Sequence, residues 1–270
     1  MTQTVFDRFR SALASGIERL ERARRSGEPR ALWREALALE HVIQCDLLSL
    51  REEEEVIGTL EPERVALCRD IFCVLETQIE SSFAAMALSG GDAVLARIDG
   101  ITENYLVRYE ELARKEIALA GMTGRDRVLF IGSGPLPITA IEYHRQTGCE
   151  VDCVDFSPQA IDTSHEVLGR LRLDSAIHPQ LLRGENVPAG GWTVVLVGVL
   201  ARPKREIFEN LARVCPDGCR VLARTTFGLR GLIYEPMGWD PASLGGFRMT
   251  GTNEARADQI ISAIGYVLGR

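Results

Sequence analysis

The sequence has 270 residues, 46% of them hydrophobic, with a net charge of −7 and a pI near 5.3. This acidic balance, without a long basic tract, argues against a surface for nucleic acid or anionic membranes. Residues 1–13 lack the apolar core of a secretory signal, and the longest apolar run, 194–201, is too short to span a bilayer. We therefore expect a cytoplasmic protein that binds neither nucleic acid nor membrane.

Apolar residues recur at three- and four-residue steps through the first part of the chain, which is the pattern of amphipathic helices. The first helix shows it most clearly, with a face made of Phe6, Phe9, Leu13, Ile17 and Leu20. Further helices are predicted over 32–43, from Pro62 onward and over 103–120. We expect a helical-bundle domain over residues 1–122.

From residue 126 onward, short apolar runs alternate with amphipathic segments. The strands are predicted over 127–132, 150–155, 192–199 and 219–225, with two more over 247–253 and 260–269. The helices between them are predicted over 136–146, 157–171 and 203–215. Near-continuous apolar strands that alternate with helices indicate a parallel sheet covered on both faces. The predicted fold is α/β, a Rossmann-like sheet of the class I methyltransferase type over residues 123–270, preceded by the helical domain.

A glycine turn follows the first predicted strand, in VLFIGSGPLPITAIEYH at 128–144. Gly132 and Gly134 suit a sharp strand-to-helix turn whose backbone lies close to a ligand. Pro135 and Pro137, however, remove backbone N–H donors where a pyrophosphate would need them. The turn therefore favours a nucleoside ligand with a non-phosphate tail over NAD or FAD.

Asp155 ends the second predicted strand, 21 residues beyond Gly134. An acidic residue at this place can accept hydrogen bonds from both ribose hydroxyls of a nucleoside. Enzymes of NAD and of S-adenosylmethionine share this combination, and the two prolines favour S-adenosylmethionine. A tight turn without a ligand is the structural alternative.

Several segments together resemble the nicotianamine synthase family. FIGSGPLP at 130–137 matches the family's phrase at its first sheet strand, and ETQIESSF at 76–83 resembles its acidic helix. ENYLVRYEELARKE at 103–116 and RTTFGLRGLIYEP at 224–236 resemble later segments in the same order. The resemblance covers residues 70–270, whereas the first 60 residues do not match the plant members, and Glu235 separates Tyr234 from Pro236.

The resemblance implies transfer of the 3-amino-3-carboxypropyl (aminobutyryl) arm of S-adenosylmethionine to an amine, with 5′-methylthioadenosine as the leaving group. The short chain is similar to the bacterial branch that makes opine-type metallophores of the staphylopine and pseudopaline type, in which the acceptor is histidine. A downstream opine reductase and a homodimer are compatible with this branch. Nicotianamine synthase proper, an ordinary methyltransferase and a non-catalytic binder remain open as alternatives.

The resemblance also carries roles to single residues. Glu80 is the candidate base that deprotonates the amine, although an ordinary solvated helix glutamate would look the same in the sequence. Tyr105 is expected to hydrogen-bond the amine or Glu80, and Arg224 and Tyr234 to bind the carboxylate of the methionine arm. The predicted cofactor-binding residues are Gly132, Ser133, Gly134, Pro135, Asp155, Phe156 and Gly198, with Glu185 and Asn186 near the adenine.

The seven cysteines and four histidines give no recognisable metal motif, because no CxxC and no metal-ligand spacing of histidines occurs. Cys149, Cys153, Cys215 and Cys219 lie in or beside apolar stretches, which favours buried free thiols over zinc ligands. We expect no metal to be needed for the chemistry.

Overall fold

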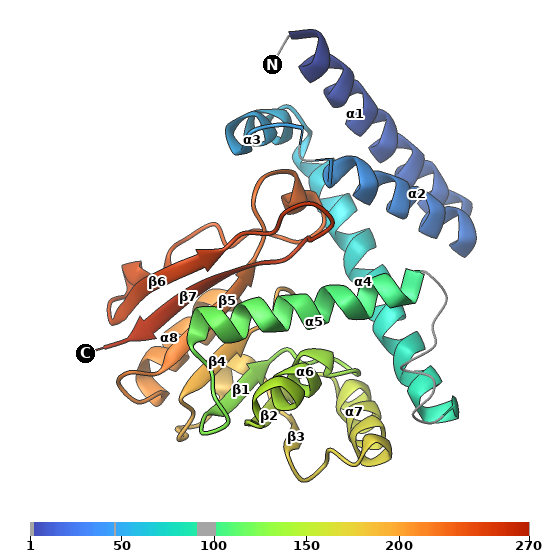
Figure 1. The fold of residues 1–270 in the computed structure, drawn as a ribbon. Coiled ribbons are helices and arrows are strands. Elements are labelled where there is room, and N and C mark those ends of the chain that lie inside the picture. The colour runs from blue at the N-terminus through green and yellow to red at the C-terminus, as the bar shows by residue number, and fades with distance from the viewer. Residues whose placement is uncertain (1–2, 46, 91–100, 270) are drawn as a thin grey trace. The chain divides into compact units, whose positions relative to one another are not determined.

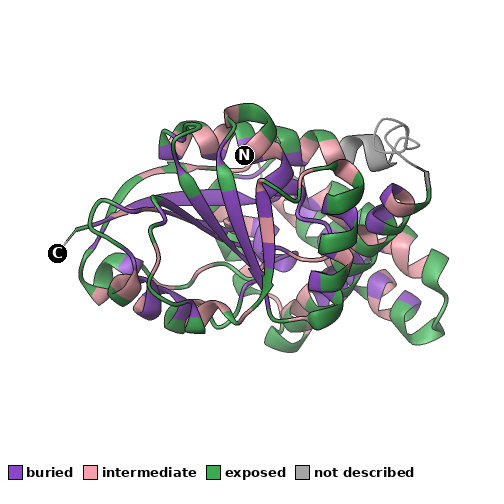
Figure 2. Cartoon of the chain, turned by 90° about the horizontal axis from the view of Figure 1, so that it is seen from below, coloured by how far each residue is buried: buried purple, intermediate pink, exposed green. Residues whose placement is uncertain are grey.

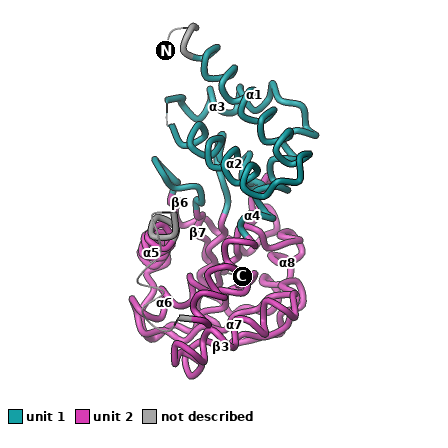
Figure 3. Tube along the Cα trace, turned by 90° about the vertical axis from the view of Figure 1, so that its right-hand side faces the viewer, with its two compact units in different colours: residues 1–76, 225–236, 254–262 teal, residues 77–224, 237–253, 263–270 magenta. Residues whose placement is uncertain are grey.

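The computed structural model describes residues 3–45, 47–90 and 101–269, with the side chains of residues 3–5, 90 and 101–105 left out of the description. The contacts within the chain divide it into two compact units (Figure 3). Unit 1 comprises residues 1–76, 225–236 and 254–262, and unit 2 comprises residues 77–224, 237–253 and 263–270.

Unit 1 is helical. Its elements are α1 (Gln3–Ser26), α2 (Pro29–Ile43), α3 (Leu50–Gly58), the first half of α4 (Pro62–Gly90) and the short 3₁₀ helix η2 (Gly228–Leu232). α1 and α2 pack closely, because a Cβ atom on Gly16 would lie only 3.0 Å from the Cδ1 atom of Leu39. Hydrogen bonds tie the later segments to the helices: Leu229 N–H donates to Glu53 at 3.0 Å, and Arg69 Nε donates to the carbonyl of Gly231 at 2.7 Å.

Unit 2 contains a seven-stranded sheet in the order β3-β2-β1-β4-β5-β7-β6 (Figure 1). The strands are β1 (Arg127–Ile131), β2 (Glu150–Asp155), β3 (Ile177–Leu181), β4 (Val194–Val197), β5 (Arg220–Thr225), β6 (Phe247–Asn253) and β7 (Ser262–Leu268). β1 to β5 pair in parallel, whereas β6 runs antiparallel to β7. The helices are α5 (Ile101–Ala120), α6 (Ile138–Thr147), α7 (Pro158–Leu171) and α8 (Lys204–Val214), with the 3₁₀ helices η1 (Gly184–Asn186) and η3 (Pro241–Leu244).

The two faces of the sheet are covered by different helices. One core cluster joins the inward side chains of α5, α6 and α7 to alternate residues of the central strands, among them Val128, Phe130 and Leu196. Ile131 points the other way and lies beside η1 and Ile207 of α8. β4 is buried along its whole length, and β1 and β5 are buried at every residue after the first (Figure 2). Parallel strands buried on both faces explain the near-continuous apolar runs in the sequence.

The strand order confirms the predicted fold class, an α/β sheet of the class I methyltransferase type with helices before it. Among the described residues, one strand and one α-helix are additional to the predicted ones, besides the short 3₁₀ helices. β3 contains Pro179 and begins the strand order, so it is an edge strand, where proline is tolerated. α3 begins with a capping box between Ser49 and Glu52.

The division into units does not coincide with the predicted boundary between residues 122 and 123. α5 and the second half of α4 belong with the sheet, and residues 225–236 and 254–262 belong with the helices of unit 1. A single boundary in the sequence cannot describe two units that are each made of several segments. The boundaries of independently folding domains therefore stay a prediction.

Within the described part of the chain, α4 is the one helix whose length and composition would allow it to cross a membrane. Its most apolar stretch has a mean hydropathy of 1.3, and a third of that window is buried within the protein. A core helix of a water-soluble protein passes the same test. The feature is therefore weak evidence for a membrane span.

Candidate functional site

The turn after β1 is built as the sequence indicates. Gly132 and Gly134 have φ angles of +79° and +67°, a region that glycine enters without steric cost. Gly132 N–H donates to the carbonyl of Val154 at 2.8 Å, which ties the turn to the end of β2. Pro137 is the N-cap residue of α6 and provides no capping side chain. The chain thus passes from β1 into α6 through a turn with two left-handed glycines.

Asp155 and Glu80 meet this turn at Gly134. Gly134 N–H donates to Asp155 Oδ2 at 3.0 Å, and the other carboxylate oxygen of Asp155 accepts from Ser157 N–H at 2.9 Å. A Cβ atom on Gly134 would lie 2.5 Å from Oε2 of Glu80, so the Glu80 carboxylate rests directly against the glycine. All of these groups belong to unit 2. Unit 2 therefore brings a partly exposed carboxylate, a glycine turn and a buried aspartate into one place.

One aromatic and one aliphatic side chain are exposed beside Asp155. Phe156 follows Asp155 directly and is 68% exposed, and Leu181, the register partner of Asp155 on β3, is 55% exposed. The guanidinium carbon of Arg183 lies 5.9 Å from the centre of the Phe156 ring. Exposed apolar side chains at the carboxyl ends of parallel strands are suited to stack on a planar ligand.

Glu185 and Asn186 lie on η1, which follows β3. Glu185 Oε1 lies 3.8 Å from Arg183 Nη1, and Glu185 Oε2 is enclosed without a hydrogen-bond partner among the described residues. An enclosed carboxylate oxygen without a donor is costly, and the amino group of a bound ligand would relieve that cost. Asn186 is exposed.

Gly198 and Ser133 are close to the same turn. Gly198 N–H donates to the carbonyl of Ile131 at 2.9 Å, and a Cβ atom there would lie 3.0 Å from that oxygen. Only glycine allows the chain after β4 to come so near β1. Ser133 is buried, and Pro135 is partly exposed. The structure thus places the predicted cofactor-binding residues at the carboxyl ends of β1, β2 and β4 and on η1.

Arg224 lies in a different environment from the one predicted for it. Its Nε and Nη2 atoms donate to the two carboxylate oxygens of Glu116 at 2.7 and 2.8 Å, and Nη2 also donates to Thr139 at 2.9 Å. The side chain is 4% exposed and Glu116 is fully enclosed. Because the guanidinium is engaged inside unit 2, the geometry favours a structural role for Arg224 over the predicted contact with a substrate carboxylate.

Tyr234 belongs to unit 1, and its hydroxyl donates to Glu76 Oε2 at 2.8 Å. Its carbonyl accepts from the Thr226 hydroxyl at 2.7 Å, so the segment after β5 folds back on itself. Tyr105, the other predicted tyrosine, lies in α5, but its side chain is outside the described residues.

Several participants in these contacts were not among the predicted site residues. Glu76 holds the Tyr234 hydroxyl, Arg183 lies over Phe156, and Glu116 pairs with Arg224. Glu116 had a signal in the sequence, because it lies seven residues after Tyr109 and four before Ala120 on the buried face of α5. A charged residue at such a position needs a buried partner.

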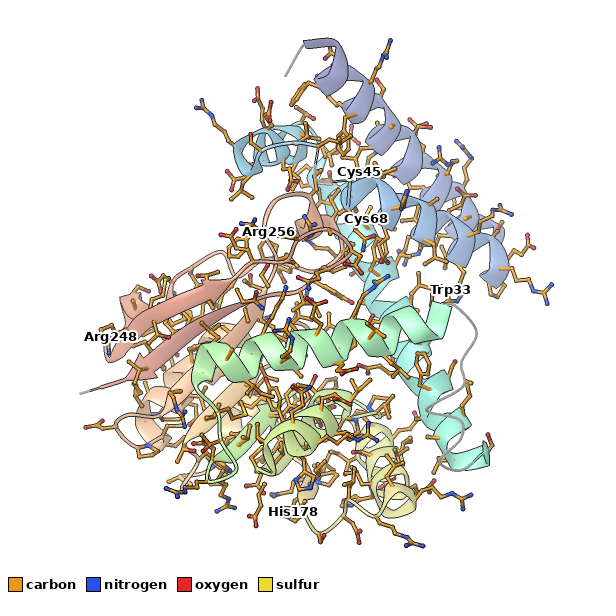
Figure 4. The ribbon with its side chains drawn as sticks, in the orientation of Figure 1. Trp33, Cys45, Cys68, His178, Arg248 and Arg256 are labelled. Carbon is orange, nitrogen blue, oxygen red and sulfur yellow. The ribbon has the colours of Figure 1, made fainter. Side chains whose placement is uncertain are left out.

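Among the described residues, no three His, Cys, Asp or Glu side chains come together to hold a metal ion. The cysteines are free thiols, of which Cys68 is buried in α4 and Cys45 is exposed (Figure 4). Burial raises the pKa of Cys68 to about 12 and also raises that of Cys153, so both thiols are neutral at pH 7. His178 lies on β3, at the edge of the sheet (Figure 4).

Comparison with known proteins decides the family. A family model described as "Nicotianamine synthase protein" matches residues 8–265. The chain belongs to the nicotianamine synthase family. The match includes the first helices of the chain, which the resemblance noted in the sequence did not reach.

Curated relatives in the family come from bacteria and plants. The chain is 30% identical over 146 residues to the L-histidine 2-aminobutanoyltransferase of Pseudomonas aeruginosa, which covers 54% of this chain and 55% of that enzyme. It is 34% identical over 137 residues to the enzyme of the same name from Yersinia pestis, and the alignment covers 50% of this chain and 51% of that enzyme. A nicotianamine synthase-like protein of Hordeum vulgare is 26% identical over 172 residues, and the alignment covers 59% of this chain and 61% of that protein. The chain spans about half the length of the curated relatives that it matches.

Solved structures of MtNAS confirm the fold over nearly the whole chain. A glutamate-to-glutamine mutant of MtNAS in complex with S-adenosylmethionine has a TM-score of 0.84 at 23% identity, covering 97% of this chain and 98% of that chain. MtNAS in complex with MTA and tNA has a TM-score of 0.82 at 24% identity, covering 96% and 97%.

Proposed function

We propose that this protein transfers the 3-amino-3-carboxypropyl group of S-adenosylmethionine to the amine of histidine and releases 5′-methylthioadenosine. The proposal is supported by membership of the nicotianamine synthase family and by the names of the bacterial relatives from Pseudomonas aeruginosa and Yersinia pestis. A structural neighbour, MtNAS, binds S-adenosylmethionine. The reaction would serve the biosynthesis of an opine-type metallophore.

The observation that carries the proposal is the position of Glu80. Its carboxylate rests against Gly134, whose N–H donates to Asp155. Asp155 is the acidic residue expected to accept hydrogen bonds from a ribose. A base at the glycine turn would lie beside the arm of the cofactor that this turn holds. A protonated amine acceptor needs a group to take its proton before its nitrogen can attack, and Glu80 would be that group.

The reaction consists of one substitution and one proton transfer. The amine nitrogen of histidine, freed of its proton by Glu80, donates its lone pair to the γ-carbon of the methionine arm. The bond from that carbon to sulfur breaks, its electron pair neutralises the sulfonium, and methylthioadenosine leaves. Because the sulfonium is already a good leaving group, the protein supplies mainly position and a base.

The remaining residues have binding roles in this proposal. Asp155 accepts from the ribose, Phe156 stacks on the adenine, and the enclosed Oε2 atom of Glu185 accepts from the adenine amino group. Gly132, Ser133, Pro135 and Gly198 shape the turn, and Asn186 borders the adenine. Tyr105 would orient the amine, and Tyr234 would bind the methionine carboxylate.

Nicotianamine synthase proper is the second candidate, favoured by the plant relatives and the family model. In that reaction the acceptor is another aminocarboxypropyl unit, so the two functions differ in the acceptor and not in the leaving group. The cytoplasmic location, a homodimer and a downstream opine reductase belong to the first proposal, the transfer to histidine.

Substitution Glu80→Gln tests the role of the base. It keeps the shape of the side chain and removes its basicity, so turnover should fall by about a hundredfold or more while S-adenosylmethionine binds with nearly unchanged affinity. Calorimetry would measure binding, and chromatography would measure methylthioadenosine release.

The matched control is Glu110→Gln, which neutralises an exposed glutamate of α5 in the same unit. It should leave both quantities unchanged. Full turnover in Glu80→Gln would remove the base from the proposal.

A further inference from the structure

Four side chains form a buried polar network inside unit 2. Glu116 of α5 accepts from Arg224 of β5 through both oxygens, and its Oε2 atom also accepts from the hydroxyl of Tyr143 at 2.7 Å. Thr139 accepts from Arg224 Nη2 at 2.9 Å. Tyr143 and Glu116 are fully enclosed, and Arg224 and Thr139 are nearly so. Of these four residues, Arg224 is the one that was predicted to contact a substrate.

The charges in this network are fixed by their surroundings. Burial alone would lower the pKa of Arg224, but the neighbouring Glu116 carboxylate outweighs it and raises that pKa, so the guanidinium stays charged. Burial and the same carboxylate raise the pKa of the Tyr143 hydroxyl, which therefore remains a neutral donor. The guanidinium carbon lies 5.7 Å from the centre of the Phe130 ring and 5.8 Å from that of Tyr109.

Such a network adds little net stability, because an apolar core of the same volume would avoid the desolvation of two charges. The network does, however, have a geometric consequence. Bidentate pairing fixes both the distance and the orientation of the two partners. A buried polar network with every member bonded holds the elements that carry it in one arrangement.

The network converges on α6, the helix that begins at the glycine turn. Thr139 is the second residue of α6, two residues after Pro137, and Tyr143 lies one turn further. Phe130, in contact with the guanidinium, lies two residues before Gly132 at the end of β1. Both ends of the turn at 132–137 are therefore anchored against Arg224. Pro137 offers no capping side chain to hold the helix start by itself.

We propose that Arg224, Glu116, Tyr143 and Thr139 are positioning residues that hold the first turn of α6, and with it the glycine turn, in the place required to bind S-adenosylmethionine. This inference rests on the proposed function for the identity of the ligand. The four residues act through the backbone of the turn and do not touch the reacting atoms.

Two single substitutions test the inference while leaving the ion pair in place. Tyr143→Phe removes one hydroxyl donor, and Thr139→Val removes one acceptor at the start of α6. Each should raise the KM and the Kd for S-adenosylmethionine about fivefold or more, as expected for the loss of one buried hydrogen bond, with kcat at saturation within about twofold of the wild-type value. Thr139→Ser, which retains the hydroxyl, should restore the affinity.

Tyr266→Phe is the matched control. Tyr266 is another buried tyrosine of unit 2, burial and the nearby Asp240 carboxylate raise the pKa of its hydroxyl, and it lies on β7 away from α6. It should lower the melting temperature by an amount similar to Tyr143→Phe and leave S-adenosylmethionine affinity unchanged.

The outcomes separate the two proposals. Wild-type affinity in both Tyr143→Phe and Thr139→Val, or an equal loss of affinity in Tyr266→Phe, would overturn the positioning role and leave the proposed function intact. Failure of the wild-type protein to bind S-adenosylmethionine would overturn both.

Discussion

At the scale of single residues, Gly134 is the most constrained position of the site. It combines a φ angle of +67° with contacts on two sides, to Asp155 through its N–H and to Glu80 through its Cα. A residue with a side chain would meet both a backbone penalty and a collision with the Glu80 carboxylate. Glycine is therefore required here for conformation and for space.

Substitution Gly134→Ala should lower both turnover and stability. The new methyl group would displace the Glu80 carboxylate, so turnover should fall on the order of tenfold to a hundredfold. The left-handed backbone should also reduce the free energy of unfolding by about 1–2 kcal/mol. Steady-state kinetics and chemical denaturation measure the two quantities.

Gly148→Ala provides the comparison, because Gly148 ends α6 with a φ angle of +80° and has open space around its Cα. It should show a similar loss of stability with normal turnover. If Gly134→Ala kept normal turnover as well, the contact between Glu80 and the turn would have no catalytic importance.

The sequence predicts residues better where local geometry determines their role. Gly132, Gly134 and Asp155 follow from strand, turn and spacing, and the structure places them together. Arg224 shows the limit of this reasoning. The end of a strand gives its position, but its partners Glu116, Tyr143 and Thr139 come from other elements, and their positions depend on tertiary packing.

At the scale of elements, the strands that carry the site are fixed at their opposite ends by a second polar cluster. Asp126 precedes β1, and its carboxylate accepts from Thr193 before β4 at 2.7 Å and pairs with Arg220 of β5. Its other oxygen accepts from Thr123 N–H at 2.7 Å. The starts of three neighbouring strands are thereby aligned.

This cluster predicts a pH dependence of stability. Burial would raise the pKa of Asp126, but bonds from Thr193 and Thr123 and the charge of Arg220 outweigh it and lower that pKa below its ordinary value of 3.8. A carboxyl group with a depressed pKa stabilises the fold above its ordinary pKa, and the contribution is lost as the pH falls through the folded-state value.

Asp126→Asn should reduce the free energy of unfolding by about 1–3 kcal/mol at pH 7, and the difference from wild type should shrink as the pH falls below about 3.8. Urea denaturation at several pH values measures this, with Asp162→Asn, at an exposed position of α7, as the control. A difference that stayed constant with pH would show that the carboxylate charge of Asp126 does not stabilise the fold.

The elements that sequence patterns predict are those with regular periodicity. Of the predicted strands, β1, β4, β5 and β7 are rich in apolar residues, β2 alternates apolar and acidic residues, and β6 is mainly polar; all six are present. β3 was missed because Pro179 and the polar residues beside it interrupt the pattern, and α3 because four consecutive glutamates obscure its apolar face. In both cases tertiary pairing or capping decides what periodicity alone does not.

At the scale of the whole molecule, each of the two units consists of three separate stretches of the chain. α4 runs from one unit into the other, and the strands β5, β6 and β7 are connected through segments that belong to unit 1. Hydrogen bonds from Arg69 and to Glu53 fix the segment after β5 to the helices of unit 1. Composition along the sequence could not reveal this, because the exchanged segments are short.

Transfer of the amino-acid arm of S-adenosylmethionine to histidine is the central claim, and product analysis tests it most directly. The purified protein is incubated with S-adenosylmethionine and either L- or D-histidine, and the products are identified by mass spectrometry. The account predicts methylthioadenosine and aminobutyryl-histidine in equal amounts with one of the two enantiomers. Formation of S-adenosylhomocysteine with a methylated acceptor, or no consumption of S-adenosylmethionine, would contradict it.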